Sequence, residues 1–359
     1  MMSRKRSKVL VALSGGVDSA MSAFILKKEG WEVHGLHFLL PGPRGIQEMK
    51  TKTVRAISTF LGIPLQLLDV GAFFEDRVLQ PFREAYFNGL TPNPCVLCNE
   101  VMKFEYLSRT AKEQDIPFVA TGHYARVIRK KNPARVALMR GRDVDKEQSY
   151  FLHRIAPRHL QMTLFPLGEK EKSWVRDMAR KEKIPCHALP ESQEICFLGG
   201  GDYRQFIEQR TFGPYEKQGR IIDKTGKVVG RHRGAHRYTI GQRKGLGIAS
   251  PRPFYVKEIR PSTNEIVVAR KEDLYSREVT AKDARWIEGK PPAEKEVMAQ
   301  IRYRHRAAPG VLRITSSGKI EFLFHEPQWA VTPGQALVFY EGDRVLGGGW
   351  ICREDEKDI

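Results

Sequence analysis

The hydrophobic positions in the first half of the chain follow two alternating patterns. Nearly continuous apolar runs of strand length lie at 8–13, 32–39, 64–70 and 117–122. Amphipathic stretches between these runs, such as 18–29 and 100–113, have the spacing of helices with one buried face. Strands that alternate with helices predict an α/β domain, in which helices cover a parallel sheet.

The pattern changes after residue 199, where short apolar runs are separated by Gly and Pro. The segment GRIIDKTGKVVG (219–230) is typical of a hairpin with a turn at DKTG. Beyond about Val279 we find only strand patterns, in VMAQIRYRHR (297–306), GVLRITSSGKIEFLF (310–324) and QALVFYEGDRVLGGGWI (335–351). We therefore expect three domains: an α/β domain over 1–203, a small linker domain over 204–270, and a β-barrel over 271–359.

Composition narrows the class of protein. Of 359 residues, 41% are hydrophobic, which is too many for a disordered chain and enough for more than one core. No stretch approaches the roughly 18 apolar residues of a membrane span, and the apolar run VLVAL is too short for a signal peptide. We therefore expect a cytoplasmic protein that does not act at a membrane.

The charge balance is strongly basic. Sixty Lys and Arg against 42 Asp and Glu give a net charge of +18, which favours a polyanionic partner. A basic surface that serves only solubility is the alternative, and charge alone does not separate the two. Sequence motifs are needed to choose between a polyanionic partner and a basic surface that serves only solubility.

The segment LSGGVDS (13–19) lies between a predicted strand and a predicted helix. Backbone N–H groups and the positive end of the helix dipole converge there, and the two glycines let an anion approach closely. The spacing is that of neither a Walker loop nor a dinucleotide fold. A tight turn capped by Asp18 or Ser19 is the structural alternative. The motif resembles the PP-loop of ATP pyrophosphatases, which implies ATP, adenylation of a substrate oxygen, and Asp18 as a partner for magnesium pyrophosphate.

The five cysteines are few and odd in number, unlike the disulfide framework of a secreted protein; they are Cys95, Cys98, Cys186, Cys196 and Cys352. Two of them stand three positions apart in TPNPCVLCN (91–99). Such a pair fits half of a zinc site, a redox pair or a catalytic sulfur. We interpret Cys352 as an ordinary small buried residue.

Several further motifs occur in one order along the chain: TGHYAR (121–126), DKEQSYFL (145–152), ESQEICF (191–197), TIGQRKGLGI (239–248), RYR (302–304), TPGQALVFY (332–340) and LGGGWI (346–351). Together with the PP-loop they resemble the tRNA-specific 2-thiouridylase family over nearly the whole chain. The resemblance implies sulfur insertion at C2 of the wobble uridine, position 34, of tRNAs for Lys, Glu and Gln. It also implies a β-barrel like the second domain of elongation factors, a protein that donates persulfide sulfur, and no role for DNA.

The resemblance assigns roles to individual residues. Cys196 is the persulfide carrier, and Cys98 is the second nucleophile, which forms a disulfide with Cys196 after sulfur transfer. The ATP-binding positions are Ala12, Leu13, Ser14, Gly15, Gly16, Val17, Asp18, Ser19, Phe38 and Gly122. The tRNA-contacting positions are Asn93, Pro94, Cys95, His123, Lys146, Glu147, Gln148, Arg302, Tyr303 and Gln335. For His123 a core histidine is the alternative, and for GQRKGLG a plain hairpin; GGGWI indicates tight barrel packing.

The sequence departs from the family at Cys95, where a carboxylate is usual, so the role of this position stays open. Three thiols, Cys95, Cys98 and Cys196, are the ligand set of a [4Fe-4S] cluster with one open iron, and this gives a second mechanism for the same product. A zinc site with Cys186 or His187 as fourth ligand is a third interpretation. The segment 39–58 is also shorter and less acidic than in the family.

Two rivals belong to other classes. A PP-loop synthetase or amidotransferase that acts on a small metabolite would need neither the paired thiols nor a grip on tRNA. A module that only binds RNA would contain the PP-loop sequence without cleaving ATP.

Overall fold

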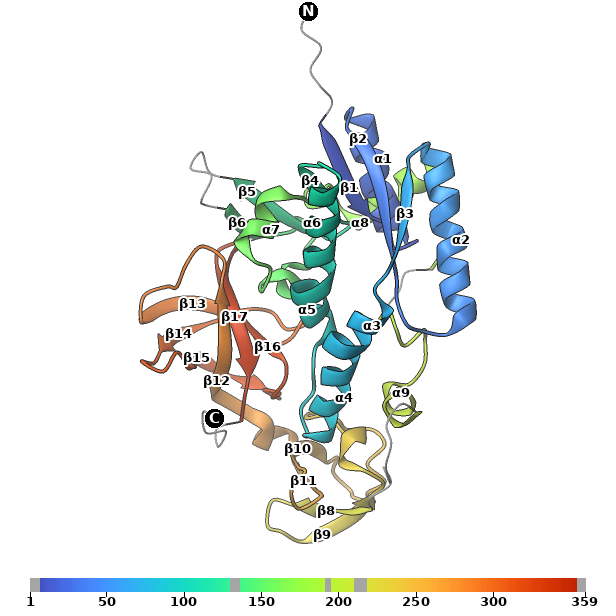
Figure 1. The fold of residues 1–359 in the computed structure, drawn as a ribbon. Helices are drawn as coiled ribbons and strands as arrows, with labels where there is room; N and C mark the ends of the chain where they lie inside the picture. Colours follow the sequence, from blue (N-terminus) through green and yellow to red (C-terminus); the bar gives the residue numbers. More distant parts are fainter. Residues whose placement is uncertain (1–6, 130–135, 191–194, 210–217, 354–359) are drawn as a thin grey trace, which may run out of the picture.

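The computed structural model describes residues 7–129, 136–190, 195–209 and 218–353 (Figure 1). Its first part contains a five-stranded sheet in the order β3-β2-β1-β4-β7, and all neighbouring strands are parallel. These strands are β1 (Lys8–Ala12), β2 (Glu32–Leu39), β3 (Leu65–Asp69), β4 (Phe118–Ala120) and β7 (Thr163–Leu164). The predicted parallel α/β sheet is confirmed, and β7 adds an edge strand to it.

Helices cover both faces of this sheet because alternate residues of β1 point to opposite sides. Val9 and Val11 pack in one cluster with α1 (Val17–Lys28), α2 (Arg44–Leu61) and α8 (Lys172–Lys181). Leu10 packs on the other face against α6 (Phe104–Glu113). β1 is therefore buried on both sides, as its continuous apolar run predicts.

A second group of helices runs from the sheet toward the lower part of Figure 1. It comprises α3 (Gly71–Phe74), a π-helical turn (Glu75–Leu79), α4 (Gln80–Phe87), α5 (Pro94–Cys98) and a second π-helical turn (Asn99–Lys103). Phe197 packs edge-on against Phe74 and Phe82, with ring centroids 5.9 and 5.4 Å apart. This contact ties the segment that follows Cys196 to α3 and α4. Two short helices complete the part, α7 (Pro157–Met162) and α9 (Tyr203–Gln209).

The middle part is a four-stranded sheet in the order β10-β11-β8-β9. It comprises β8 (Gly219–Asp223), β9 (Val228–His232), β10 (Tyr255–Arg260) and β11 (Glu265–Ala269). β8 and β9 form the predicted antiparallel hairpin. Asp223 closes its turn, because the carboxylate accepts bonds from the backbone N–H groups of Thr225 and Lys227.

The last part is a closed β-barrel, because its first strand also pairs with its last. The strands are β12 (Tyr275–Trp286), β13 (Glu294–Gln300), β14 (Ala308–Ile314), β15 (Ile320–Trp329), β16 (Ala336–Glu341) and β17 (Arg344–Ile351). The barrel prediction is confirmed. The strand expected across 297–306 is too long, because β13 ends at Gln300, whose amide donates to the carbonyls of Arg302 and Tyr303 in the turn that follows.

The glycines of GGGWI pack as tightly as expected. A Cβ at Gly347 would lie 2.1 Å from the Arg285 carbonyl oxygen, and one at Gly348 would lie 2.4 Å from that of Leu337. Only glycine therefore fits where β17 crosses its neighbours.

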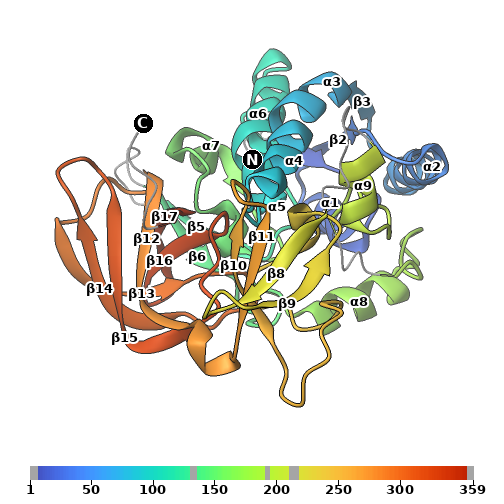
Figure 2. The ribbon, with the colours of Figure 1, turned by 90° about the horizontal axis from the view of Figure 1, so that it is seen from below.

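A hairpin from the first half of the chain joins the barrel sheet. Its strands are β5 (Ala125–Arg129) and β6 (Val136–Arg140), and β6 pairs with β17 at Val345 and Arg344. The hydrophobic pattern did not predict this pairing, which is a long-range contact. Seen from below, the barrel lies on one side and α2 on the other, with β8 and β9 in front (Figure 2).

No helix in the described part of the chain is long and apolar enough to cross a membrane.

Candidate functional site

The loop between β1 and α1 is closed by its own serines. The Ser19 hydroxyl accepts from the Ser14 N–H at 3.1 Å and donates to the Gly16 carbonyl at 2.9 Å. Gly15 has a φ of +86°, which favours glycine, and Gly16 is the N-cap of α1 in an extended conformation. The N-terminus of α1 is thus presented at the carboxyl edge of β1, as the motif predicts.

Two further features fit this loop to an anionic ligand. A Cβ at Gly122 would lie 2.7 Å from the Ser19 nitrogen, so the 121–123 segment packs directly on the first turn of α1. His37 is buried below the loop, where its Nδ1–H donates to the Leu13 carbonyl at 2.7 Å. Burial lowers the pKa of His37, and among the described residues its Nε2 has no hydrogen-bond partner. A neutral imidazole with one uncommitted nitrogen beside Phe38 suits the edge of a nucleotide site.

Asp18 makes a contact that the sequence did not indicate. Its two carboxylate oxygens accept from Lys172 Nζ at 2.6 and 2.7 Å, and Tyr124 donates its hydroxyl to Oδ1 at 2.8 Å. Lys172 begins α8 and is buried, whereas Asp18 keeps about a third of its side-chain surface exposed. No motif marks Lys172, since only the fold brings it across 154 positions.

Both thiols of the pair, Cys95 and Cys98, lie on α5, directly before the second π-helical turn. Pro94 at the first helical position and Asn93 as N-cap start α5, and the Asn93 side chain accepts from the Val96 N–H at 3.4 Å. Cys98 is buried, Cys95 is half-buried and Cys196 is exposed. All five cysteines are free thiols, so the implied disulfide between Cys98 and Cys196 stays a prediction.

The structure brings the three thiols to one place. Burial raises the pKa of Cys95 to about 11 and that of Cys98 to about 12, and the charge of Cys196 adds to both shifts. Lys103, in the π-helical turn after Cys98, opposes these shifts with its positive charge. The buried thiols are therefore protonated near neutral pH, and Lys103 is the cation that favours their ionised form.

The metal alternatives gain no support from this geometry. Among the described residues, no group of three or more His, Cys, Asp or Glu side chains is placed to hold a metal ion. Cys186 is fully buried next to the PP-loop; burial, and to a smaller degree the charge of Asp18, raise its pKa to about 11. Cys352 is buried as expected, and its thiol lies 3.5 Å from the Thr280 hydroxyl.

The shortened segment 39–58 lies against both the PP-loop and the segment that contains Cys196. It contains most of α2, and the Lys50 ammonium on this helix donates a hydrogen bond to the Cys196 carbonyl at 3.3 Å. The Lys50 carbonyl oxygen also lies 3.5 Å from the position of a Cβ on Gly15. α2 therefore connects the PP-loop to the Cys196 segment.

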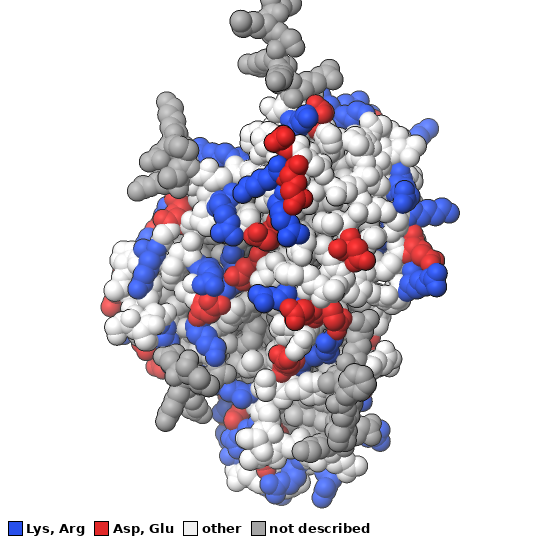
Figure 3. All heavy atoms as spheres, in the orientation of Figure 1, with Lys and Arg blue, Asp and Glu red and all other residues white. Residues whose placement is uncertain are grey.

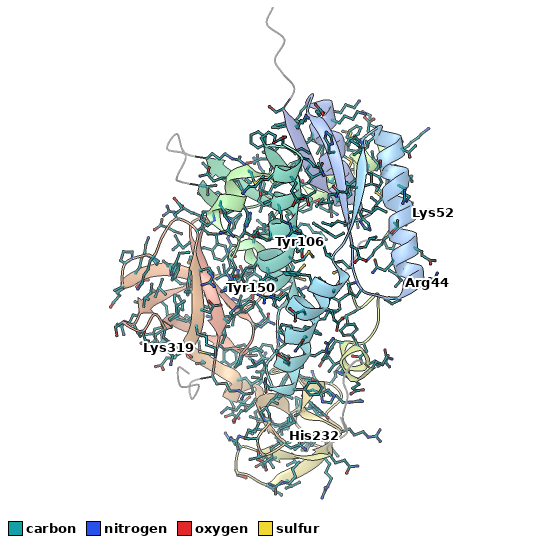
Figure 4. All side chains as sticks on the ribbon, in the orientation of Figure 1. Arg44, Lys52, Tyr106, Tyr150, His232 and Lys319 are labelled. Carbon is teal, nitrogen blue, oxygen red and sulfur yellow. The ribbon has the colours of Figure 1, made fainter. Side chains whose placement is uncertain are left out.

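The barrel reaches the segment that precedes the thiol pair. Gln335 donates its side-chain amide to the Thr91 carbonyl at 2.8 Å, and the Thr91 N–H donates to the Pro333 carbonyl at 2.9 Å. Tyr150, which lies between α5 and the barrel in Figure 4, donates its hydroxyl to the Ala336 carbonyl at 3.0 Å. The segment that contains Asn93 is thus held by the barrel from one side.

Two of the other tRNA-contacting candidates, Glu147 and Gln148, are engaged in hydrogen bonds within the protein. Glu147 is buried, binds the Ser149 N–H and lies 3.2 Å from Arg140, while Gln148 exchanges bonds with the Tyr124 backbone. Both side chains thereby hold the Lys146–Gln148 turn in shape.

Three more candidates lie partly exposed. Arg302 donates to the Trp329 carbonyl at 2.9 Å, and Tyr303 packs on Phe151 with ring centroids 4.4 Å apart. His123 stacks on Phe104, and although its side chain is partly exposed, desolvation by the surrounding protein holds its pKa well below the usual range, so its imidazole is neutral. These rings and the guanidinium could stack on nucleotides.

A buried ion-pair network links the thiol region to the barrel. Arg154 has 2% of its side chain exposed; it contacts Glu100 at 2.5 Å and Asp283 of β12 at 2.7 Å. Glu100 follows Cys98 by two positions, so this network fixes the orientation of the π-helical turn. Neither Arg154 nor Glu100 stood out in the sequence.

The excess positive charge does not gather in one patch on the face shown in Figure 3. Lys and Arg lie over all three parts of the molecule there, and Asp and Glu are interspersed among them. The sign of the charge favours a polyanion, but this face alone does not outline its path.

Comparison with known proteins gives matches along the whole fold. Residues 7–200 match a family model described as tRNA methyl transferase HUP domain. Residues 204–270 match a tRNA methyl transferase PRC-barrel domain, and residues 276–351 match an aminomethyltransferase beta-barrel domain.

Full-length relatives are similar to the chain from end to end. A tRNA-specific 2-thiouridylase MnmA from Carboxydothermus hydrogenoformans is 42% identical, with 96% of this chain and 98% of that protein covered. One from Desulforudis audaxviator is 43% identical, with the same coverage. Among solved structures, a 4-thiouridine synthetase–RNA complex with bound ATP matches 56% of this chain and 50% of its own, at 18% identity and a TM-score of 0.36.

Proposed function

The chain belongs to the tRNA-specific 2-thiouridylase family, and we propose that it replaces the C2 oxygen of the wobble uridine, position 34, by sulfur. The observation that carries the proposal is the arrangement of Cys98 and Cys196 beside a PP-loop, with α2 in contact with both the loop and the Cys196 segment. A phosphate-binding loop and two thiols at one site fit a reaction that activates an oxygen and then displaces it with sulfur.

ATP is the substrate that activates the uridine. In this proposal the backbone of 13–19 and the N-terminus of α1 bind its phosphates, while Phe38 and Gly122 border the nucleoside. Asp18 is proposed to bind a magnesium ion, because its carboxylate is partly exposed and Mg²⁺ prefers carboxylate oxygens; Lys172, which contacts both oxygens in this structure, would have to give up at least one of them. Such an ion would neutralise charge on the phosphates.

The sulfur steps follow from the different exposure of the two thiols. Cys196 is exposed, so it can receive a persulfide sulfur from a donor protein. The terminal sulfur of the persulfide attacks C2, and the C2–O bond breaks with AMP as the leaving group. The buried Cys98 thiolate then attacks the sulfur of Cys196, which releases the thiocarbonyl and leaves a Cys98–Cys196 disulfide for an external dithiol to reduce.

The middle part and the barrel are proposed to hold tRNA together with residues of the first part around the thiol pair. The proposed contacts are those of Asn93, Pro94, Cys95, His123, Lys146, Arg302, Tyr303 and Gln335, with Glu147 and Gln148 shaping the turn around Lys146. The substrates are tRNAs for Lys, Glu and Gln. The proposed division at 1–203, 204–270 and 271–359 is supported by the three sheets and by the three family matches.

The test is release of pyrophosphate by the purified protein with ATP and Mg²⁺. We expect release that depends on an unmodified tRNA of these types and that persists in Cys196→Ser, because adenylation precedes sulfur transfer. Release that small metabolites stimulate, and tRNA does not, would favour a synthetase instead. Absence of release with any tRNA would leave only an RNA-binding role.

A further inference from the structure

Lys103 is a half-buried cation at the end of the second π-helical turn, Asn99–Lys103. Residues five positions apart are hydrogen-bonded in a π-helix, so Lys103 stands one turn after Cys98, on the same side. In a regular α-helix each residue adds about 100°, so five positions would turn Lys103 about 140° away from Cys98. The π-helical turn therefore brings a cation to the thiol site.

Contacts with the rest of the fold hold this turn in place. Asn99 donates its side-chain amide to the Phe151 carbonyl at 3.2 Å. Glu100 accepts from the buried guanidinium of Arg154 at 2.5 Å. The position of Lys103 is thus fixed by its neighbours in the turn, as a catalytic side chain requires.

The other side of Lys103 faces the nucleotide segment. Phe104 directly follows Lys103 and stacks on His123, with ring centroids 6.0 Å apart. The charge of Lys103 helps to lower the pKa of His123 and opposes the rise in the pKa of Cys98. Gly122 packs on the first turn of α1. Lys103 therefore lies between the proposed ATP site and the thiols.

The carboxylates that are closest to Lys103 along the chain are engaged elsewhere. Glu100 is paired with Arg154, and Glu105 contacts His159 at 2.9 Å. Within the part of the chain that the structure describes, neither carboxylate is paired with Lys103. His123 is neutral, so it adds no second positive charge. An anion that enters between the ATP site and the thiols would therefore meet one positive charge at Lys103.

We propose that Lys103 is a catalytic residue, whose ammonium binds the phosphate that joins AMP to the activated uridine. The proposal rests on the proposed function. In the adenylation step the C2 oxygen bonds to the α-phosphorus, N3 loses its proton, and pyrophosphate leaves with the electron pair of the broken P–O bond. The product is a phosphodiester with about one negative charge, and it has to lie between the nucleotide segment and the thiols, where Lys103 is.

The same ammonium favours the departure of AMP. The terminal sulfur of the persulfide attacks C2, and the C2–O bond then breaks with its electron pair on the AMP oxygen. The negative charge on the phosphate grows from about one to about two in this step. A cation that donates a hydrogen bond to this phosphate therefore stabilises the transition state more than the adenylate.

The first test is equilibrium dialysis of radiolabelled AMP, and separately of adenosine, against the full-length protein without tRNA. Lys103→Met should weaken AMP binding about tenfold or more, because a charge-assisted contact is lost, and should change adenosine binding by less than about twofold. Lys103→Arg keeps the charge and should stay within about threefold of the parent for AMP. Lys112→Met, which removes an exposed cation on α6, is the matched control and should bind both ligands like the parent.

The second test follows the adenylate itself. The parent here is Cys196→Ser, which has no persulfide to displace AMP, so label from [α-³²P]ATP should accumulate on unmodified tRNA. Lys103→Met in this parent should lower the labelled fraction about tenfold or more at equal times, whereas Lys112→Met should not change it. A labelled fraction that does not depend on Lys103 would contradict the proposal.

The dialysis also has outcomes that would overturn the proposal. These are an AMP affinity that Lys103→Met leaves unchanged, and an equal loss of AMP and adenosine affinity, which would indicate a structural effect. Unchanged AMP affinity with weaker tRNA binding would assign Lys103 to a backbone phosphate of tRNA instead. Because the dialysis contains no tRNA, it is independent of the proposed function. Lys103-dependent AMP binding in a protein that never labels tRNA would support the phosphate contact and contradict the proposed function.

Discussion

Gln335 of the barrel donates its side-chain amide to the Thr91 carbonyl, 2.8 Å away, two residues before the N-cap of α5. A residue directly before β16 thereby positions a segment 244 residues earlier, at the thiol site. This bond couples the part that is proposed to hold tRNA to the helix that carries Cys98. The barrel therefore contributes directly to the geometry of the thiol site.

Gln335→Ala removes this bond. The free energy of unfolding should fall by only about 1 kcal/mol, because one neutral hydrogen bond is lost and the Thr91–Pro333 backbone bond remains. The rate of 2-thiouridine formation should fall about tenfold, since the Asn93 segment is less well positioned. Chemical denaturation and single-turnover nucleoside analysis measure the two effects. Gln328→Ala, which removes an amide bond to the Glu326 carbonyl and a bond that Gln328 accepts from His305, should leave the rate unchanged. Equal loss of rate in both variants would contradict this role of Gln335.

The raised pKa of Cys98 predicts a steep dependence on pH. With a pKa of about 12, the thiolate fraction near pH 7 is about one in 100,000, and it grows about tenfold for each pH unit up to the pKa. Alkylation of Cys98 by a small reagent, followed by mass spectrometry, should therefore accelerate with this slope between pH 7 and 10. Lys103→Met removes a charge that favours the thiolate, so it should slow alkylation at every pH in this range.

One variant serves as the control for that experiment. Lys112→Met removes an exposed cation on α6 and should leave the alkylation rate of Cys98 unchanged. A Cys98 rate that levels off near pH 8 would show that its pKa is not raised.

Removal of Arg154 should destabilise the fold strongly. Arg154→Ala removes the buried guanidinium from the largely buried Glu100, and Arg285 remains 3.5 Å from Glu100 and 3.1 Å from Asp283, so we expect a loss of about 3 kcal/mol in free energy of unfolding. Arg158→Ala removes an exposed arginine from its pair with Glu105 and should cost less than about 1 kcal/mol. Urea denaturation of both variants tests the difference, and similar losses would argue against the network.

Gly122 should tolerate no side chain. In Gly122→Ala the new Cβ meets the backbone of Ser19 and Asp18 at 2.7–2.8 Å, so the first turn of α1 has to move and ATP affinity should fall about tenfold or more. Gly45→Ala is the control, because Gly45 lies in α2 and a Cβ at this position would have no other atom within 4 Å. This variant should leave ATP binding intact. Calorimetric titration with a non-hydrolysable ATP analogue compares them. If Gly122→Ala bound the ATP analogue as tightly as the wild type, ATP would have to bind away from the Gly122 segment.

Local pattern was sufficient for much of the fold. The apolar runs that became β1, β2 and β4 are nearly continuous because these strands are largely buried, whereas β3 is an edge strand and only partly buried. The turn at 223–226 follows from Asp223 and Gly226. The hairpin of β5 and β6 was not predicted to join the barrel, since strand pairing across 200 residues leaves no local signal. β13 proved shorter than its pattern, because the Gln300 side chain stabilises a turn at 302–303.

Motifs located the PP-loop and the thiols, but they did not indicate the residues that support them. Lys172, Lys103, Lys50 and Arg154 are charged residues without a distinctive spacing. Their roles follow only from their contacts in the fold. Lys172 contacts Asp18, Lys103 acts on the thiols, Lys50 contacts the Cys196 carbonyl, and Arg154 contacts Glu100. Such contacts depend on tertiary geometry, which a single sequence does not display.

The most direct test of the sulfur pathway follows one labelled atom. The protein is loaded with a ³⁵S persulfide on Cys196, freed of excess donor, and mixed with ATP, Mg²⁺ and an unmodified tRNA for Lys, Glu or Gln. We predict that the label moves to 2-thiouridine at position 34 within a single turnover and that a Cys98–Cys196 disulfide forms; Cys352→Ser should behave like the parent, and Cys98→Ser should form no such disulfide. Label that stays on the protein, or equal transfer in Cys196→Ser, would contradict the account.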